Sequence, residues 1–357
     1  MTDRDRVVLL RHGHRGGDIA LEGDPAVLVE LLAQLDGTRG REEILAALRA
    51  GPVPALSAAD LDEALDAMAA DAITEDASED PRHLDEHALD RYDRQLRYFS
   101  DLAPAGMPRA AAQARLESAT VAVLGLGGLG GLAATMLAAV GIGTIVGVDH
   151  DDVELSNLAR QILYREDDLG RPKVEAAAEH LGQLNGRTTF RGIAQRLEST
   201  EDVARVIAGT DFVVGAVDWP ATQISHWVNA ACWDAEIPYI SMSIFPPLLR
   251  VGPTYVPGVT GCRECQETAY RRIYPLYDKA MTVLDSHAPG ATYAPSCGVI
   301  GSLIANEVVA YITGLHPLTC EGNAFMIDTT TLTVTREAVP RDPDCPVCGT
   351  STMRPPR

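Results

Sequence analysis

The chain has 357 residues, which indicates two domains at a typical size of about 150 residues each. Hydrophobic residues make up 46% of it, enough for sizeable cores, so the chain is not disordered. Fifty acidic against 30 basic residues give a formal net charge of -20. Such a surface repels phosphate backbones and anionic lipid, so we expect neither nucleic acid nor a membrane as a main partner. No secretion signal opens the sequence, and we expect a cytoplasmic protein.

Residues 1–80 are predicted to form a small α+β domain. Short strands are expected at residues 7–10 and 18–21, around the turn-rich RHGHRGG. Helices follow at residues 26–35 and 42–48, and a third begins after Ser57 in a capping-box-like pattern. Two strands followed by three helices are typical of a winged-helix fold. The acidic composition favours a peptide ligand over DNA.

The segment LVELLAQLDGTRGREEILAAL in this domain resembles the PqqD-like peptide-recognition domains of enzymes that modify ribosomally made peptides. The resemblance implies that a leader peptide adds a strand to the small sheet and rests against a helix. Main-chain hydrogen bonds would then supply affinity and side-chain pockets selectivity. The alternative interpretation is a dimerisation or packing module.

The acidic residues 76–90 are predicted to form a linker, and residues 81–117 to lead into the main domain as a linker and dimer-contacting segment. From residue 118 to residue 357, strand-like and helix-like runs alternate. The strand-like runs are VAVLGLG, TIVGVD, TTFRGI, FVVGAVD and PYISMSI. This pattern predicts a doubly wound, Rossmann-like α/β sheet. Residues 118–148 carry no charge and are long enough to span a bilayer, but we interpret them as a buried strand-helix-strand unit.

A glycine-rich loop, GLGGLG at residues 125–130, follows a predicted strand and opens a predicted helix. Gly125 and Gly127 permit a tight turn and close backbone approach, and Gly130 lets the helix pack on the strand. The helix N-terminus offers unpaired N–H groups to a phosphate. Asp149 ends the next strand, where a carboxylate accepts hydrogen bonds from ribose hydroxyls. The loop alone indicates a nucleotide, with NAD as the default.

Cations and an acid beyond this loop favour chemistry at phosphorus over hydride transfer. The run SNLARQ contains Asn157, Arg160 and Gln161, and Lys173 opens a later helix. Positive groups stabilise the charge that builds on phosphoryl oxygens and on departing pyrophosphate. Asp218 ends the strand-like FVVGAVD, at the sheet edge where ligands bind and where a carboxylate suits Mg²⁺.

RYDRQ at residues 91–95, GLGGLG, VDHDDVELSNLARQ, GRPK and the strand-end Asp218 resemble the ThiF/MoeB/HesA superfamily of ubiquitin-activating-type adenylating enzymes, over roughly residues 90–350. The resemblance implies that the nucleotide is ATP. It also implies a homodimer with two composite sites, in which Arg94 reaches the triphosphate of the other subunit. The residues that fall on the family's ATP and Mg²⁺ positions are Gly128, Asp149, Asn157, Arg160, Lys173 and Asp218.

The sequence departs from the family at Trp219, where an asparagine is common, and the adjacent polar contact is in doubt. Trp219, Trp227 and Trp233 have helical spacing and are expected in the core.

Four of the seven cysteines form two C-x-x-C pairs, Cys262 with Cys265 and Cys345 with Cys348. Two such pairs in turn-rich loops predict a structural zinc site with four thiolate ligands. The alternative is a redox dithiol.

Cys297 lies in APSCGVIGSLIANEVV, at the start of a predicted helix, and is expected to be a packed thiol. Family members that pass on the acyl group use a cysteine in a mobile crossover loop. That loop is expected at residues 266–293, and it contains none. PSCG instead resembles the MccB-like peptide-adenylating branch, which acts in microcin maturation and needs no thioester.

The predicted function is ATP-dependent adenylation of a carboxylate of a ribosomally made precursor peptide, either its C-terminus or a side chain. Such an enzyme would act in the maturation of peptide natural products. One alternative is activation of a ubiquitin-like sulfur-carrier protein, and another is a non-catalytic peptide recruiter for a cyclodehydratase. A nicotinamide-dependent oxidoreductase would leave SNLARQ and Lys173 unexplained.

Overall fold

The computed structural model divides the chain into two compact units, Met1–Ala114 and Arg115–Arg357. The residues that the structure describes are 2–3, 6–9, 19–51, 53–71, 73–74, 84–103, 107–284 and 291–349.

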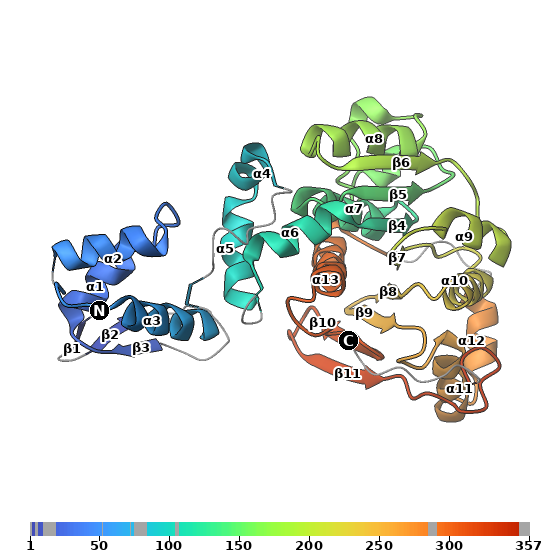
Figure 1. Ribbon diagram of the computed structural model, residues 1–357. Helices are drawn as coiled ribbons and strands as arrows, with labels where there is room; N and C mark the ends of the chain where they lie inside the picture. The colour runs from blue at the N-terminus through green and yellow to red at the C-terminus, as the bar shows by residue number, and fades with distance from the viewer. Residues whose placement is uncertain are drawn as a thin grey trace. The chain divides into compact units, whose positions relative to one another are not determined.

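The N-terminal unit begins with a three-stranded antiparallel sheet of β1 (Thr2–Asp3), β2 (Arg6–Leu9) and β3 (Ile19–Glu22). Helices α1 (Pro25–Gln34), α2 (Arg41–Ala50) and α3 (Ala58–Ala70) follow (Figure 1). The Asp24 carboxylate caps α1 by accepting from the Ala26 N–H at 2.8 Å, and the predicted capping box of Ser57 and Asp60 opens α3. The predicted order of two strands and three helices is confirmed, with β1 as an addition. The helices enclose a core of Leu31, Ile44, Leu48, Leu61, Leu65 and Met68.

Three further helices replace much of the expected linker: α4 (Glu86–Arg91), α5 (Asp93–Leu102) and α6 (Arg109–Ser118). The linker prediction for residues 84–90 was wrong, and residues 75–83 lie outside the described part of the chain. The segment is acidic, yet its few apolar side chains share one face. They form a small core of Leu84, Ala88, Tyr92, Leu96 and Ala110.

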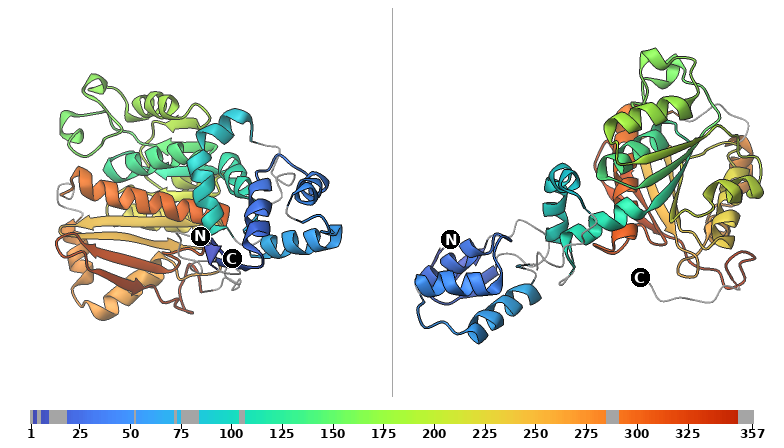
Figure 2. Two further views of the ribbon diagram at one scale, coloured as in Figure 1. Left: turned by 90° about the vertical axis from the view of Figure 1, so that its left-hand side faces the viewer. Right: turned by 45° about the horizontal axis from the view of Figure 1, so that its top comes forward.

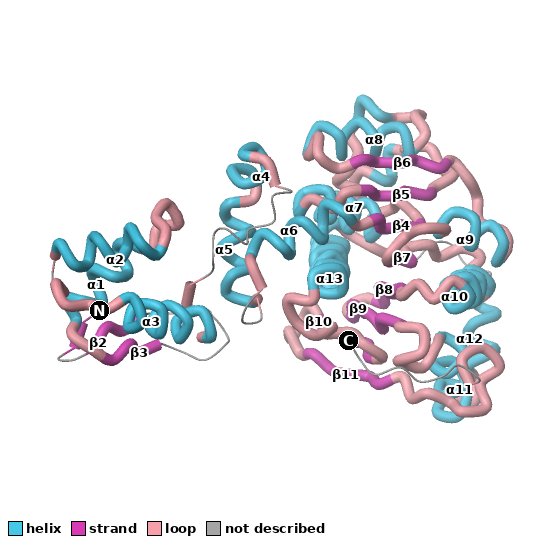
Figure 3. Tube along the Cα trace, viewed as in Figure 1, coloured by secondary structure: helices cyan, strands magenta, loops and turns pink. Residues whose placement is uncertain are grey.

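The second unit is built on an eight-stranded sheet with the order β11-β10-β9-β8-β7-β4-β5-β6 (Figures 1 and 3). Five neighbouring strands are parallel, and they are the five that the sequence predicted. They are β4 (Thr120–Leu124), β5 (Thr144–Val148), β6 (Thr189–Ile193), β7 (Phe212–Gly215) and β8 (Tyr239–Phe245). The Rossmann-like fold class is therefore confirmed.

Three antiparallel strands extend this sheet, and the sequence analysis missed them. They are β9 (Leu248–Tyr255), β10 (Asn323–Asp328) and β11 (Val334–Ala338). The sheet is thus mixed: a parallel nucleotide-binding half continues into an antiparallel half through the β8–β9 hairpin.

Helices cover both faces of the sheet (Figure 2). The two 3-10 turns Leu155–Asn157 and Glu166–Asp168 lie in the long connection between β5 and α8. Helices α11 and α12 occupy most of residues 266–284, so the expected crossover loop is largely helical there. The helices are α7 (Gly128–Val140), α8 (Lys173–Leu184), α9 (Thr200–Ile207), α10 (Gln223–Asp234), α11 (Arg263–Ile273), α12 (Tyr277–Leu284) and α13 (Ala294–Thr313).

The uncharged stretch at residues 118–148 is the buried unit β4–α7–β5, as predicted. Helix α13 is long and apolar enough to cross a membrane, but 61% of its apolar window is buried inside the protein. It packs along α7 as a core helix of this unit.

Candidate functional site

The glycine-rich loop joins the end of β4 to the start of α7, and its shape depends on the absence of side chains. Gly125 has a φ of 86°, and a Cβ there would lie 2.7 Å from the Ala216 carbonyl oxygen. A Cβ on Gly130 would lie 1.9 Å from the Gly125 carbonyl oxygen. The tight turn and the close helix packing predicted from the sequence are thus both present, and the N-terminus of α7 opens at the sheet edge.

Side chains from two distant segments flank this loop. A Cβ on Gly128 would lie 2.8 Å from Cys297 Sγ and 3.5 Å from Arg160 Cγ. A Cβ on Gly127 would lie 3.8 Å from Gln161 Nε2. The structure therefore brings the SNLARQ segment and the first turn of α13 to the glycine loop.

Asp149 follows β5 directly, and its buried carboxylate holds two backbone segments. Oδ2 accepts from the Leu126 N–H at 2.7 Å, and Oδ1 accepts from the Asp151 N–H at 2.9 Å. The Tyr164 hydroxyl donates to the Leu126 carbonyl oxygen at 2.9 Å. The loop is thus fixed before any ligand binds, which reduces the cost of ordering it.

Lys173, the first residue of α8, is buried, with 5% of its side chain exposed. Its Nζ donates to Asp151 Oδ2 at 2.7 Å and lies 4.0 Å from Asp149 Oδ2. Burial opposes ionisation of Asp151, but the hydrogen bond and charge of Lys173, together with the nearby His150 and Arg196, outweigh it and lower the pKa of that carboxyl. Lys173 is therefore a buried cation that lies against two carboxylates, which excludes the interpretation of Lys173 as an exposed lysine on a helix surface.

Asp218 follows β7 at the same edge of the sheet. Its side chain is exposed, yet the surrounding protein reduces hydration of the carboxylate and so raises its pKa. Repulsion from Asp151 and Asp149 raises the pKa further, and Lys173 partly offsets this repulsion. We call Asp149, Asp151, Lys173 and Asp218 the edge cluster. Three carboxylates share one lysine here, and this donor set is suited to a divalent cation.

The SNLARQ segment presents polar groups beside this cluster. Asn157 is buried, and its Oδ1 accepts from the Glu154 N–H at 3.2 Å. Arg160 Nη1 donates to the Ser156 carbonyl oxygen at 2.9 Å. Gln161 is 4% exposed, and its Oε1 has no hydrogen-bond partner among the described residues. A buried amide oxygen without a protein partner beside the glycine loop is open to a donor from a bound ligand or from water.

Arg94 lies on α5 in the N-terminal unit, with 91% of its side chain exposed and its Nε 3.9 Å from Asp93 Oδ2. The predicted role of Arg94 across a dimer interface stays a prediction.

The four predicted zinc ligands come together from two distant segments of the second unit. Cys262 and Cys265 begin α11, and Cys345 and Cys348 lie after β11. The sulfur–sulfur distances are 4.0 Å for Cys262–Cys265, 3.5 Å for Cys262–Cys345 and 3.2 Å for Cys265–Cys348. Bonds of about 2.3 Å to a tetrahedral zinc place sulfurs about 3.8 Å apart, so the cluster fits this ion. All four side chains are buried.

Cys297 is a buried thiol whose pKa is raised by burial, although Arg160 opposes the shift. A protonated thiol packed against Gly128 agrees with the predicted packing role. The core prediction holds for Trp233, which is 7% exposed, but it was wrong for Trp219, which is 49% exposed. Trp219 lies beyond the end of β7, beside Asp218, and not within a helix.

Sequence reasoning missed Asp151 and Tyr164 as parts of the site. Asp151 is the second acid after β5, and a run of acids at a strand end was its only sequence signal. Its ion pair with Lys173 joins residues 22 positions apart, and only the fold reveals it.

A Rossmann-like sheet with a glycine loop, a strand-end acid and a buried lysine defines a nucleotide-binding enzyme. The sequence profile of the ThiF family matches residues 92–347, and the chain belongs to this family. It is 34% identical over 268 residues to the SAMP-activating enzyme E1 of Haloferax volcanii, covering 74% of this chain and 91% of that protein. Identity is also 34% to the sulfur carrier protein ThiS adenylyltransferase of Escherichia coli, over 74% and 97% of the two chains. The chain is an ATP-dependent adenylyltransferase of the ThiF type.

Two solved structures resemble the whole chain. MccB of E. coli, solved with ATP, superposes with a TM-score of 0.69 at 25% identity, over 97% of this chain and 98% of that one. MccB has also been solved in complex with N-formylated MccA, as a microcin C7 biosynthetic enzyme. PaaA superposes with a TM-score of 0.74 at 24% identity, over 94% of this chain, and supports the fold.

Proposed function

We propose that this enzyme adenylates a carboxylate of a ribosomally made precursor peptide that its N-terminal domain, residues 1–80, binds. The observation that carries the proposal is the extent of the structural matches. The ThiF profile begins at residue 92, whereas the match to MccB covers 97% of the chain and so includes most of the N-terminal unit. MccB has been solved in complex with N-formylated MccA, which associates that architecture with a binding partner that is not named as a sulfur carrier.

Peptide binding by the N-terminal domain is supported by its architecture. A small antiparallel sheet beside three helices, resembling the PqqD-like domains, can accept an added strand of extended peptide. Its acidic helices suit a peptide better than a nucleic acid.

Activation of a sulfur-carrier protein is the second candidate. Three curated relatives, including the ThiS adenylyltransferase, are 32–34% identical to this chain. Each aligns with no more than 74% of the chain, however, whereas the match to MccB covers 97% of it.

The proposed reaction needs positive charge more than it needs a base. The peptide carboxylate is ionised at neutral pH and attacks the α-phosphorus of ATP, pyrophosphate leaves, and an acyl-adenylate remains. Arg160 and Lys173 stabilise the negative charge that grows on the phosphoryl oxygens. Asp149 binds the ribose hydroxyls, and Asn157 and Gln161 contact the nucleotide beside the glycines of the loop. Gln161 Oε1, which lacks a partner among the described residues, gains one on binding.

Asp218 and its neighbours in the edge cluster would hold Mg²⁺. When bound there, the ion neutralises phosphate charge and relieves the repulsion that raises the pKa of Asp218. Arg94 would act on the triphosphate of the partner subunit in a homodimer, since its guanidinium is 91% exposed in the single chain.

Pyrophosphate exchange tests the function directly. With ATP, Mg²⁺ and a short peptide encoded by a neighbouring gene, labelled pyrophosphate is expected to enter ATP, because acyl-adenylate formation is reversible. The control is a small protein ending in Gly-Gly. Exchange with that control alone would replace the proposal by sulfur-carrier activation, and exchange with neither would remove both.

Deleting residues 1–80 is expected to raise the Kd for the same peptide at least about tenfold, since the main-chain contacts of an added strand would be lost. Fluorescence anisotropy with a labelled peptide measures it. The melting temperature of the remaining chain serves as the control for folding. Unchanged affinity in a folded truncated protein would reject the N-terminal domain as the peptide-binding unit.

We propose zinc as the occupant of the four-cysteine cluster. Metal analysis is expected to give one zinc per chain, and Cys348→Ser should lose it and lower the melting temperature, because ligation ties two distant loops together. Cys232→Ser, a buried cysteine outside the cluster, is the matched control and should retain zinc. A zinc-free wild-type protein that melts like the metal-supplemented one would contradict the assignment.

A further inference from the structure

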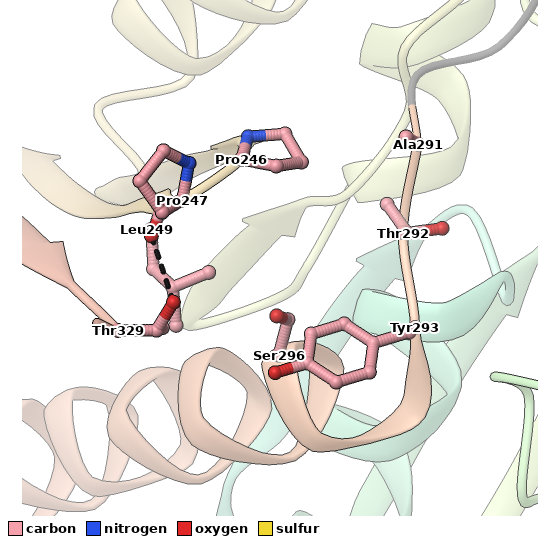
Figure 4. A pocket seen from close by; sticks show the side chains of 8 residues that line it. All are labelled: Pro246, Pro247, Leu249, Ala291, Thr292, Tyr293, Ser296 and Thr329. Atoms are coloured by element: carbon pink, nitrogen blue, oxygen red, sulfur yellow. Dashed lines mark hydrogen bonds between the residues drawn. The ribbon is translucent and has the colours of Figure 1, made fainter.

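A pocket of about 180 Å³ opens where the β8–β9 turn faces the start of α13 (Figure 4). Its walls come from four places: the β8–β9 hairpin, the segment before α13, the first turn of α13 and the end of β10. The lining residues are Pro246, Pro247, Leu249, Ala291, Thr292, Tyr293, Ser296 and Thr329.

The pocket adjoins the nucleotide loop. Strand β8 runs parallel to β7 and β4, so its carboxyl end lies at the sheet edge that also carries the glycine loop and Asp218. Ser296 lines the pocket, and the next residue, Cys297, lies against Gly128. One turn of helix α13 therefore separates the pocket from the loop that we assign to the phosphates.

The lining is neutral and mostly apolar. None of the eight residues carries a charge, and two prolines, Leu249, Ala291 and the Tyr293 ring are among them. The Thr329 hydroxyl is already used, since it donates to the Pro247 carbonyl oxygen at 3.0 Å. An apolar cavity of about 150 Å³ holds a benzene ring, so this one has room for a leucine or phenylalanine side chain.

We propose that this pocket receives the side chain of the peptide's C-terminal residue, whose α-carboxylate is adenylated, and that this residue is aliphatic or aromatic. The assignment rests on the proposed function and specifies its substrate. A charged side chain would lose hydration here, and none of the eight lining residues offers an opposite charge to offset that cost. A C-terminal glycine would leave the pocket unfilled and would gain no stabilisation from burying apolar surface. This preference would distinguish the site from one that binds a Gly-Gly tail.

The test compares acetylated tetrapeptides that share the sequence Gly-Ser-Gly and end in leucine, phenylalanine, glycine, aspartate or lysine. Pyrophosphate exchange, as kcat/KM, is expected to be at least about tenfold higher for leucine or phenylalanine than for the other three. Ala291→Trp, which adds an indole at an exposed position of the pocket wall, should abolish this preference. Val334→Trp, at an exposed residue of β11 outside the lining, should preserve it.

A second readout does not depend on adenylation. Saturation-transfer NMR with N-acetyl-phenylalanine amide, which has no carboxylate to activate, should show ring contact with the wild type and with Val334→Trp but not with Ala291→Trp. Exchange that is equal for all five peptides, or highest for glycine, would overturn the pocket assignment and leave the proposed function standing. Exchange with none of the tetrapeptides, despite NMR contact, would overturn the pocket assignment, and exchange with the neighbouring-gene peptide would then decide the proposed function separately.

Discussion

Asp218→Asn is expected to lower the pyrophosphate exchange rate by about 100- to 1,000-fold, because the substitution removes the charge that would hold Mg²⁺ at the edge of the sheet. The affinity for the peptide is expected to stay unchanged, since peptide binding is assigned to the N-terminal domain. Asp234→Asn, at an exposed aspartate at the end of α10, is the control and should exchange at the wild-type rate. If the variant lost both its peptide affinity and its exchange activity, the separate assignment of the peptide site and the Mg²⁺ site would be wrong.

Asp218→Asn is expected to lower activity but not the stability of the fold. The pKa of Asp218 is raised chiefly because the surrounding protein reduces hydration of its carboxylate, with added repulsion from Asp151 and Asp149. A raised carboxylate pKa means that folding disfavours the ionised form, and this cost is present at neutral pH and disappears as pH falls below the raised value. Asp218→Asn should therefore melt at the same temperature as the wild type or higher. As the pH is lowered, pyrophosphate exchange by the wild-type enzyme should begin to decline at a higher pH than the pKa of an ordinary aspartate, about 3.9, would predict. A lower melting temperature would contradict this assignment of a functional rather than structural role.

Lys173→Met is expected to lower exchange by about 100-fold or more, because methionine keeps much of the side-chain length and removes the cation that we assign to the phosphates. It should also reduce the free energy of unfolding by less than the roughly 3–5 kcal/mol that breaking a buried pair costs, since Asp151 is 51% exposed and can be rehydrated. Exchange kinetics and denaturant unfolding measure the two effects.

The chain offers a matched control for this variant, because Lys279 is its only other lysine and lies exposed on α12. Lys279→Met should leave both quantities at wild-type values. If Lys173→Met lowered the free energy of unfolding by the full amount of roughly 3–5 kcal/mol while the folded fraction still exchanged at the wild-type rate, Lys173 would have a structural role only.

The parallel half of the sheet could be predicted because its evidence is local. Buried strands such as TIVGVD read as apolar runs that end in a turn or an acid, and each is followed by a helix-like segment. Strands β9, β10 and β11 were missed because they are antiparallel, two of them lie toward the edge of the sheet, and β9 contains Gly252 and Pro253, which usually argue against a central strand. Helix α4 was missed because its three charged residues outnumber its two apolar ones, and α12 was missed because it is short and lies in the segment expected to be the crossover loop.

The site could be predicted in its composition but not in its internal contacts. The motif order placed Gly125, Asp149 and Lys173 near one ligand, and the structure brings them together. No sequence pattern indicated that Cys297 packs on Gly128, or that Asp151 shares Lys173 with Asp149, because these pairs form only when distant segments meet at the sheet edge. The apolar pocket was unforeseen for the same reason: its walls come from residues 246–249, 291–296 and 329.

The four-cysteine cluster has a consequence for laboratory refolding. Cys262 and Cys345 are 83 positions apart, so the proposed zinc ligation would close a long loop that contains α11, α12, α13, β10 and β11. Closing a long loop removes much chain entropy from the unfolded ensemble, and mispaired or oxidised thiols would block it. Diluting denatured protein into buffer that already holds reductant and Zn²⁺ should therefore recover more active enzyme than supplying the ion afterwards.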